Sequence, residues 1–421
     1  MGKVGLVLSG GVAKGAYEAG LLKALAQKEI IPTVIVGISA GAINGTFAAS
    51  AIARGMFNAE FIEEELVWLW QHKANAANLY ACFDQTPQSR IANRSLSNIF
   101  TRLGIDPLHR HYAPRIGWDT ILAFEQLVKG DFVSLISHGF LRTVLEARLF
   151  PVTKVIRPVT LSIVATDLQG STVITAEQEL LARYAHFEDF VWLDRTENEW
   201  ESFIMRLRQM IVASASFPFI FPPCPLDLAD GSTHLFADGG IMDCAPISRA
   251  IQLDPDIDTV LVSLGPTIID AAAELAPTLP KLLSRVFTML AGRYLIANFR
   301  KVAQVNRRIE RLMPHLDRDK KGRISLSRRN EDLCMAAGFT SLEQFLSRRV
   351  VKLVPICPIP ALPGEVFDGF FKPELMLHYI QQGYTDTLSA LRHAEILPAP
   401  AQIETIIERK RRTTKRRAAE A

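Results

Sequence analysis

The chain has 421 residues, of which 48% are hydrophobic and 22% are charged, and its formal net charge is +3. This composition indicates a globular protein with one large or two medium domains, and the small charge argues against a nucleic-acid partner. Five scattered cysteines without a Cys-x-x-Cys spacing argue against structural zinc and predict free thiols in a reducing compartment. We find neither a signal-peptide pattern nor a run of about 18 apolar residues, so we expect a cytoplasmic protein without a membrane span.

The first forty residues follow a strand, helix, strand pattern. Apolar side chains over 3–9 predict a buried strand, and helical spacing of apolar residues predicts a helix over 14–28. Pro32 introduces a second strand over 33–38. This order implies a right-handed parallel crossover, which places the loops after both strands at the same edge of one sheet.

Ser39 stands at the end of the second strand, inside the sequence Gly37-Ile38-Ser39-Ala40-Gly41. Gly37 and Gly41 leave room for the sharp turn of a nucleophile elbow, and a helical pattern begins directly after it. Ser39 is therefore the candidate nucleophile. A Gly-x-Ser-x-Gly by itself also fits a buried turn in which small residues serve only packing. Other motifs are therefore needed to distinguish a nucleophile elbow from such a turn.

The loop after the first strand is rich in glycine and contains Gly10, Gly11, Val12, Lys14 and Gly15. Backbone N–H groups between a strand and a helix can hold an anion or a developing oxyanion. The spacing excludes a dinucleotide-binding loop, which needs Gly-x-Gly-x-x-Gly, and a Walker loop, which needs Ser or Thr after the lysine. For Lys14 we expect a solvated first-turn lysine, with a positioning role as the alternative.

The rest of the chain gives a weaker pattern that alternates between helix and strand. We predict a cap-like region over 60–150, strands over 159–166, 171–175, 259–264 and 350–357, and helices over 201–215, 278–313, 331–348 and 372–394. The composition shifts after Gly265 toward long stretches of Leu, Arg and Ala. We therefore expect a catalytic domain over 1–265, a mainly helical extension over 266–400 and a basic, disordered tail over 401–421.

Asp238 is the candidate base for the serine. It lies between the apolar pair Phe236-Ala237 and the turn Gly239-Gly240, where burial would raise the pKa of its carboxyl toward a useful value. The alternative is an ordinary Asp-Gly turn. The histidines give no better candidate, because most of them look like surface or loop residues and two fall on a late helix: His72, His109, His111, His138, His186 and His315, then His378 and His393.

Together, these motifs resemble the patatin-like phospholipase family. That family combines a glycine loop, a Gly-x-Ser-x-Gly elbow and an Asp-Gly-Gly turn, which stand here in the same order at 10–15, 37–41 and 238–240. The segment 213–223 resembles the proline-bearing stretch before the family's aspartate, and 383–387 resembles its late helix. Two positions depart from the family pattern: Val12 replaces a third glycine, and Cys244 replaces an asparagine.

The resemblance implies a three-layer α/β/α fold with a mainly parallel central sheet and a helical C-terminal extension. It also implies a Ser39–Asp238 dyad without histidine, in which the amides around Gly10 to Val12 hold the oxyanion. The implied activity is acyl hydrolysis of a lipid ester, of the phospholipase A or lysophospholipase type, without cofactor or metal. Val12 keeps its N–H, whereas Cys244 lacks an amide that could help to position Asp238.

Two rival functions stay open at this stage. An α/β-hydrolase esterase with a Ser-Asp-His triad needs a histidine after the acid, and only His315, His378 and His393 follow Asp238. A non-catalytic lipid-binding regulatory protein with the same fold would have no need for both the dyad and the glycine loop.

Two further segments add little to the functional prediction. Residues 317–324 resemble a calcium loop, but Lys321 occupies a ligand position and Arg328 replaces the required glutamate, so we expect no metal there. The segment 409–417 has seven basic residues in nine, which predicts a solvated tail or, as the alternative, contact with an anionic membrane surface. Nucleic acid is the third alternative, and nothing elsewhere in the sequence supports it.

Overall fold

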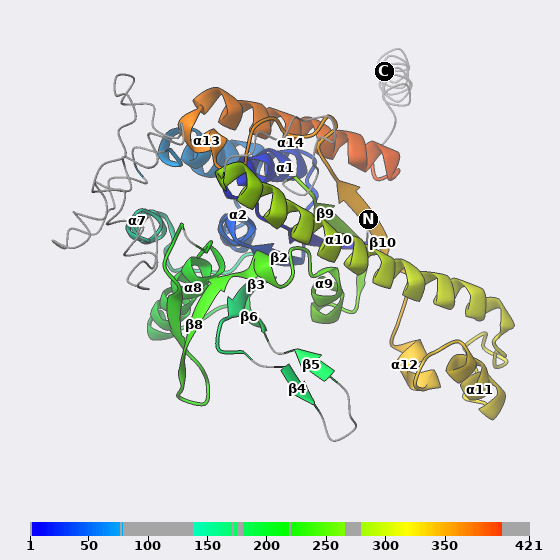
Figure 1. Cartoon of the computed structure of the whole chain (residues 1–421). Helices are drawn as coiled ribbons and strands as arrows, with labels where there is room; N and C mark the ends of the chain where they lie inside the picture. Colours follow the sequence, from blue (N-terminus) through cyan, green and yellow to red (C-terminus); the bar gives the residue numbers. More distant parts are fainter. Residues whose placement is uncertain are drawn as a thin grey trace, which may run out of the picture.

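The computed structural model describes residues 2–75, 138–265 and 279–397, together with Asn78 and apart from 171, 175–179, 183 and 219. Most of the predicted cap over 60–150 and the whole basic tail over 401–421 lie outside the described residues. Figure 1 shows a central sheet with helices packed on both of its faces. The predicted three-layer α/β/α architecture is confirmed.

The central sheet has eight strands in the order β10-β9-β1-β2-β3-β8-β7, and β6 also pairs with β3. The strands are β1 (Lys3–Leu8), β2 (Val34–Ile38), β3 (Val159–Asp167), β6 (Ala185–Trp192), β7 (Cys224–Asp227), β8 (Thr233–Asp238), β9 (Ile257–Ser263) and β10 (Lys352–Ile356). The five strands from β10 to β3 are parallel, whereas β6, β8 and β7 pair antiparallel with their neighbours. The parallel strands are apolar on both faces because helices cover both.

One of the predicted strands lies outside the central sheet. The strand predicted over 171–175 is β4 (Thr172–Ile174), which pairs not with β3 but with β5 (Leu180–Ala182), in a separate two-stranded sheet. The antiparallel edge of β3 is taken by β6 instead. Phe190 and Trp192 of β6 are buried in the core, and this burial favours the longer, aromatic strand over the short one.

Helices cover the two faces of the sheet unequally. The principal helices are α1 (Ala16–Gln27), α2 (Ala40–Ala53), α7 (Gly139–Arg148), α8 (Glu197–Ser214), α9 (Ile247–Leu253), α10 (Leu279–Leu312), α11 (Arg328–Ala336), α12 (Leu342–Leu346) and α14 (Pro373–His393). The short elements are η1 (Val12–Gly15), α3 (Ala59–Phe61), η2 (Ile62–Val67), η3 (Leu69–Lys73), η4 (Gly239–Ile241), η5 (Met313–His315) and α13 (Asp368–Phe371).

The larger hydrophobic core lies between the sheet and α1, α2, α8 and α14, and the smaller one lies between the sheet, α9 and α10.

The C-terminal helix α14 packs directly on α1, the helix that follows the glycine loop. A Cβ atom on Gly20 would lie 1.9 Å from the Ile380 carbonyl oxygen, and one on Gly383 would lie 1.9 Å from the Tyr17 carbonyl oxygen. The two backbones can approach this closely only because both crossing points are glycines. Residues far beyond the predicted catalytic domain thus pack on its first helix, and the division at residue 265 stays a prediction.

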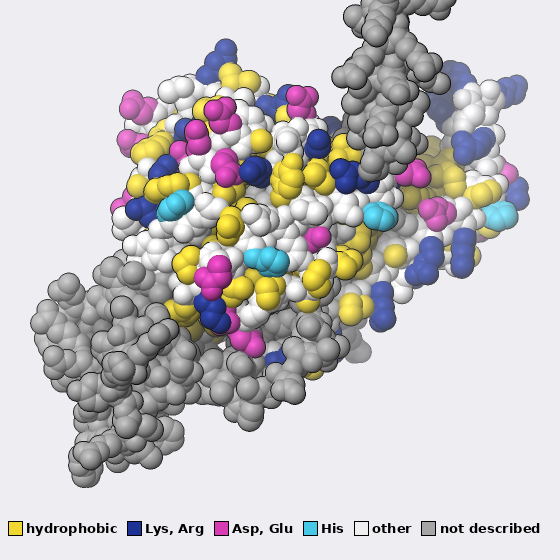
Figure 2. All heavy atoms as spheres, turned by 90° about the horizontal axis from the view of Figure 1, so that it is seen from above, with side chains coloured by type: hydrophobic (Ala, Val, Ile, Leu, Met, Phe, Trp, Pro, Cys, Tyr) yellow, Lys and Arg dark blue, Asp and Glu magenta, His cyan; other side chains and the backbone are white. Residues whose placement is uncertain are grey.

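The far end of α10 carries a small structure of its own. Figure 1 shows α11 and α12 at the end of α10 that lies away from the sheet. Their core contains Ile309, Phe339 and Phe345. On the face seen in Figure 2, charges of both signs alternate with scattered hydrophobic side chains. None of the described helices is long and apolar enough to cross a membrane.

Candidate active site

The strand register brings the two halves of the site together along β3. Ile38, the last residue of β2, pairs with Val164, and Asp238 at the end of β8 pairs with the next residue, Ala165. Both strands lie on the same edge of β3, because β6 occupies its other edge over 159–166. Asp238 therefore lies beside the point where β2 ends and Ser39 begins.

Ser39 has the strained backbone of a nucleophile elbow. Its φ of 54° and ψ of −125° are rarely adopted by L residues, and it directly precedes α2. A Cβ atom on Gly37 would lie 2.6 Å from the Gly41 carbonyl oxygen, so the turn requires this glycine. The Ser39 N–H donates to Ser214 Oγ over 2.9 Å, and Ser214 donates onward to the Val164 carbonyl over 2.5 Å. The buried Ser214 therefore ties the elbow to β3.

The glycine loop lies directly against the elbow. A Cβ atom on Gly10 would lie 2.4 Å from the Ile38 carbonyl oxygen and 2.9 Å from Ser39 Cβ. Three successive residues have positive φ: 70° at Gly10, 143° at Gly11 and 55° at Val12. Val12 thus keeps a left-handed conformation although it is β-branched, which stores backbone strain in the loop.

The amides of this loop have different partners. The Gly10 N–H donates to Glu18 Oε1 over 3.3 Å, and the Ala13 N–H donates to the Val366 carbonyl over 3.0 Å. The N–H groups of Gly11 and Val12 have no hydrogen-bond partner among the described residues. Of the three amides expected to hold an oxyanion, these two are free for a ligand.

The expectation of a solvated Lys14 is wrong. Lys14 is buried, its Nζ donates to the Leu362 carbonyl over 3.2 Å, and burial lowers the pKa of its ammonium group. The ammonium group therefore points to the segment 362–368 and is engaged there. Gly15 lies against α2, where a Cβ atom would meet Ala40 Cβ at 2.4 Å.

Asp238 is fixed by its backbone and by one carboxylate oxygen. Its N–H donates to the Ser216 carbonyl over 2.9 Å, and its own carbonyl accepts from Thr166 Oγ1 over 2.8 Å. Oδ1 accepts the Gly240 N–H over 2.8 Å, while a Cβ atom on Gly239 would lie 2.3 Å from the Val164 carbonyl oxygen. The geometry of the turn therefore requires Gly239, whereas Gly240 contributes its backbone N–H.

The second carboxylate oxygen of Asp238, Oδ2, is available to accept a proton. Asp238 is 3% exposed, and burial raises the pKa of its carboxyl to about 6, against smaller lowering effects of the Ser39 hydroxyl and the Gly240 amide. Ser39 is thus close enough to lower this pKa, yet Oδ2 has no partner with full hydrogen-bond geometry among the described residues. Hydrogen bonds between a serine and its candidate base are often long without substrate and align on binding.

Cys244 does not take part in holding Asp238. Its Sγ contacts the Ala291 carbonyl of α10 at 2.8 Å, and burial raises the pKa of its thiol to about 12. Ser216, Thr166 and Gly240 hold the aspartate without the amide that the family often has at this position.

One histidine differs from the prediction. His138 is 7% exposed and not a surface residue: its Nε2 lies 2.9 Å from Ser216 Oγ, and its ring stacks on Phe221. Burial lowers the pKa of this imidazole to about 4. His315 is exposed, as expected, and His378 and His393 lie on α14, as expected, and are exposed there. His109 and His111 lie outside the described residues.

Sequence reasoning missed several polar residues around the site. Ser214 and Ser216 were within the segment 213–223 that resembles the family, so a signal for them existed. Glu18 and Asn44 had none, because an acidic residue in a first helical turn and an asparagine in a helix are usually exposed.

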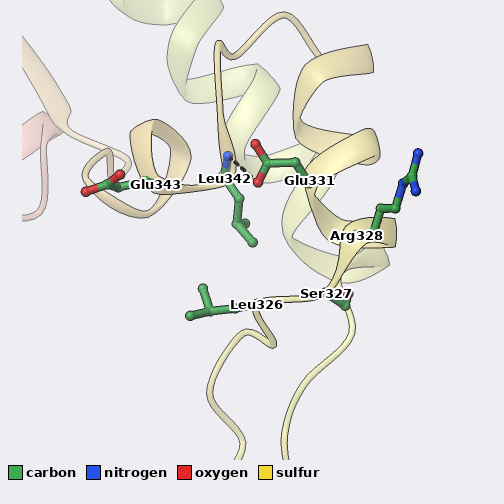
Figure 3. A pocket seen from close by; sticks show the side chains of 6 residues that line it. All are labelled: Leu326, Ser327, Arg328, Glu331, Leu342 and Glu343. Atoms are coloured by element: carbon green, nitrogen blue, oxygen red, sulfur yellow. Dashed lines mark hydrogen bonds between the residues drawn. The ribbon is translucent and has the colours of Figure 1, made fainter.

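A separate pocket of about 410 Å³ lies between α11 and α12 (Figure 3). Its lining includes Leu326 and Leu342, and the Leu342 N–H donates to Glu331 Oε2 over 3.1 Å. It holds none of the predicted site residues. Within the described ranges, no group of three or more His, Cys, Asp or Glu side chains could hold a metal ion.

Comparison with known proteins adds a family match to this geometry. The model of the family described as patatin-like phospholipase matches residues 6–251. The solved structure of VipD from Legionella pneumophila is 18% identical, with 93% of this chain and 67% of that chain covered, but its TM-score of 0.35 carries no weight here. No curated protein matches. Since the family model covers more than half of the sequence, this chain belongs to the patatin-like phospholipase family, whose general activity is the hydrolysis of lipid acyl esters.

Proposed function

We propose that this chain is a serine lipid acyl hydrolase of the phospholipase A or lysophospholipase type, with Ser39 as nucleophile and Asp238 as base. The observation that carries the proposal is the register along β3, where the strained serine elbow and the buried aspartate lie next to each other. The glycine loop against the same elbow supports it, because it offers two free amides.

In the first step, Ser39 Oγ attacks the carbonyl carbon of the ester while its proton passes to Oδ2 of Asp238. The carbonyl π electrons move to the oxygen, and the N–H groups of Gly11 and Val12 stabilise that oxyanion. A carboxyl pKa of about 6 suits this role, since the group is mostly ionised at neutral pH and still basic enough to accept the proton.

In the second step, the tetrahedral intermediate collapses and the bond to the leaving alcohol breaks. The proton on Asp238 passes to that alcohol, which departs as the lysolipid or glycerol product. Water then attacks the acyl-serine ester and Asp238 accepts a proton from the water. When this second tetrahedral intermediate collapses, the bond from the acyl carbon to Ser39 Oγ breaks, Asp238 passes that proton to Ser39 Oγ, and the fatty acid is released. Neither step needs a metal ion or a cofactor.

The exposure of His315, His378 and His393 gives no support to a Ser-Asp-His triad. Among the described residues, the polar groups that shift the pKa of the Asp238 carboxyl belong to Ser39 and Gly240, and neither is a histidine. A non-catalytic lipid-binding protein would have no use for an elbow that holds its serine in a strained conformation. The proposed partner is a lipid ester in a membrane that the protein reaches from the cytoplasm, and the basic tail would contact the anionic surface.

The decisive experiment assays purified protein against phospholipids, lysolipids and neutral glycerides beside Ser39→Ala and a control, Ser50→Ala. Ser50 lies in α2, the helix that follows Ser39, and is not part of the proposed dyad. We expect Ser39→Ala to lose turnover at least about 1,000-fold and the control to keep it. A fluorophosphonate should label the wild type at Ser39. Normal turnover by Ser39→Ala, or labelling of another serine, would refute the dyad, and an inactive wild type that binds lipid would favour the regulatory alternative.

A further inference from the structure

A buried carboxylate that is not part of the proposed dyad contacts the glycine loop. Glu18, in the first turn of α1, is 0% exposed. Its Oε1 accepts the Gly10 N–H over 3.3 Å, and its Oε2 accepts Asn44 Nδ2 over 3.0 Å. Among the described residues it forms no ion pair with Lys or Arg.

Asn44 connects this carboxylate to the helix that follows Ser39. It lies in α2, and its Nδ2 also donates to the Gly15 carbonyl over 2.9 Å. Its Oδ1 accepts Trp70 Nε1 over 2.8 Å. The indole therefore fixes the orientation of the amide, so that the NH2 group faces Glu18 and the glycine loop.

A carboxylate without a cation partner is a poor choice for packing alone. Burial raises the pKa of Glu18 to about 7, while the Asn44 amide, the Ser263 hydroxyl and the backbone amides of Gly10 and Ser9 lower it. A hydrophobic side chain would avoid this desolvation cost. What the carboxylate supplies is two acceptor oxygens, one for the loop amide and one for α2.

We propose that Glu18 is a positioning residue of the hydrolase, which anchors the Gly10 amide and, through Asn44, fixes the oxyanion loop relative to Ser39. With the Gly10 N–H turned back to Glu18, the amides of Gly11 and Val12 are left for the reacting oxygen. The inference rests on the proposed function and adds a requirement to it: the glycine loop must keep a fixed position relative to the turn at Ser39.

The test compares Glu18→Gln and Glu18→Leu with the wild type on a short, soluble p-nitrophenyl ester at about pH 8.5, where Glu18 is ionised. Glutamine has the same shape but one acceptor oxygen, so either Gly10 or Asn44 would face its NH2 group. The control is Asp386→Asn, which alters the hydrogen bond from Tyr17, the residue before Glu18, on another side of α1.

We expect kcat to fall about 10-fold in Glu18→Gln and about 100-fold in Glu18→Leu, with KM changed less than about 2-fold, because only oxyanion stabilisation is lost. The rate of inactivation by a fluorophosphonate should fall by the same factors, since its phosphoryl oxygen enters the same hole. Asp386→Asn should leave both rates unchanged.

Wild-type kcat in Glu18→Gln would overturn the positioning role. So would a loss of kcat that only matches the fraction of unfolded protein measured by circular dichroism. Failure of the proposed function looks different, because the wild type itself would then neither hydrolyse the ester nor react with the fluorophosphonate.

Discussion

Replacing the buried aspartate of the site should stabilise the protein, and the gain should depend on pH. Burial raises the pKa of Asp238 from 3.8 to about 6 in the folded protein. A folded-state pKa above the unfolded value means that stability is fully present below about pH 4 and is lost as pH rises through about 6. Asp238→Asn cannot ionise, so it should escape this loss.

The size of the effect follows from the shift. A rise of about two pKa units corresponds to about 3 kcal/mol of unfolding free energy. Asp238 is 3% exposed, so solvent screening reduces this value little. Between about pH 4 and pH 7.5, the difference in unfolding free energy between Asp238→Asn and the wild type should grow by about 3 kcal/mol in favour of the variant. The buried amide adds an offset that does not vary with pH.

Urea unfolding at a series of pH values measures this difference. The control is Asp230→Asn, because hydrogen bonds from Ser232 lower the pKa of the exposed Asp230 and its stability contribution is lost as pH falls. In that control, any pH dependence should have the opposite sign. A constant difference between Asp238→Asn and the wild type from pH 4 to pH 7.5 would refute the raised pKa, and with it the reason for assigning the base to this carboxylate.

Three further predictions concern rates and binding. Because the base must be unprotonated, kcat/KM for a soluble ester should fall as pH drops through about 6, about tenfold per pH unit, and a flat profile would exclude Asp238 as base. Ser214→Ala leaves the Ser39 N–H without its acceptor and should lower kcat about 10-fold. The control Ser162→Ala removes another buried hydroxyl and should leave kcat unchanged. Equal kcat values for Ser214→Ala and the wild type would show that the turn at Ser39 does not need this hydrogen bond. Truncation after Glu408 should weaken binding to anionic vesicles at low salt and leave hydrolysis of a soluble ester unchanged. Equal vesicle binding by the truncated and full-length proteins would show that the tail does not contact the membrane.

The central fold could be predicted because its signals are local. The first 41 residues predict a β-α-β order with glycine turns after both strands. In the structure, β1 and β2 are parallel neighbours joined through α1. The antiparallel edge was harder, because β6, which pairs with β3 there, is not among the predicted strands. The burial of Phe190 and Trp192 in the core favours this pairing, and sequence spacing carries no information on such packing.

The residues of the site likewise fall into a group that the sequence could predict and a group that it could not. Ser39, Asp238 and the glycines stand in short motifs, so their meeting at one edge of the sheet could be expected. Lys14 and His138 could not be placed, since a lysine in a first turn and a histidine in a loop are usually solvated. Their burial depends on the segment 362–368 in one case and on Ser216 and Phe221 in the other.

The glycine loop is held from parts of the chain that lie far apart in sequence. Glu18 and Asn44 hold it from α1 and α2, while the Val366 and Leu362 carbonyls accept from Ala13 and Lys14. Three successive residues with positive φ, one of them a valine, would relax if the loop were free. These contacts therefore stabilise a strained loop, and two of them come from residues beyond the family match at 6–251. Loop geometry, and with it turnover, should depend on the C-terminal segment although that segment supplies no proposed catalytic group.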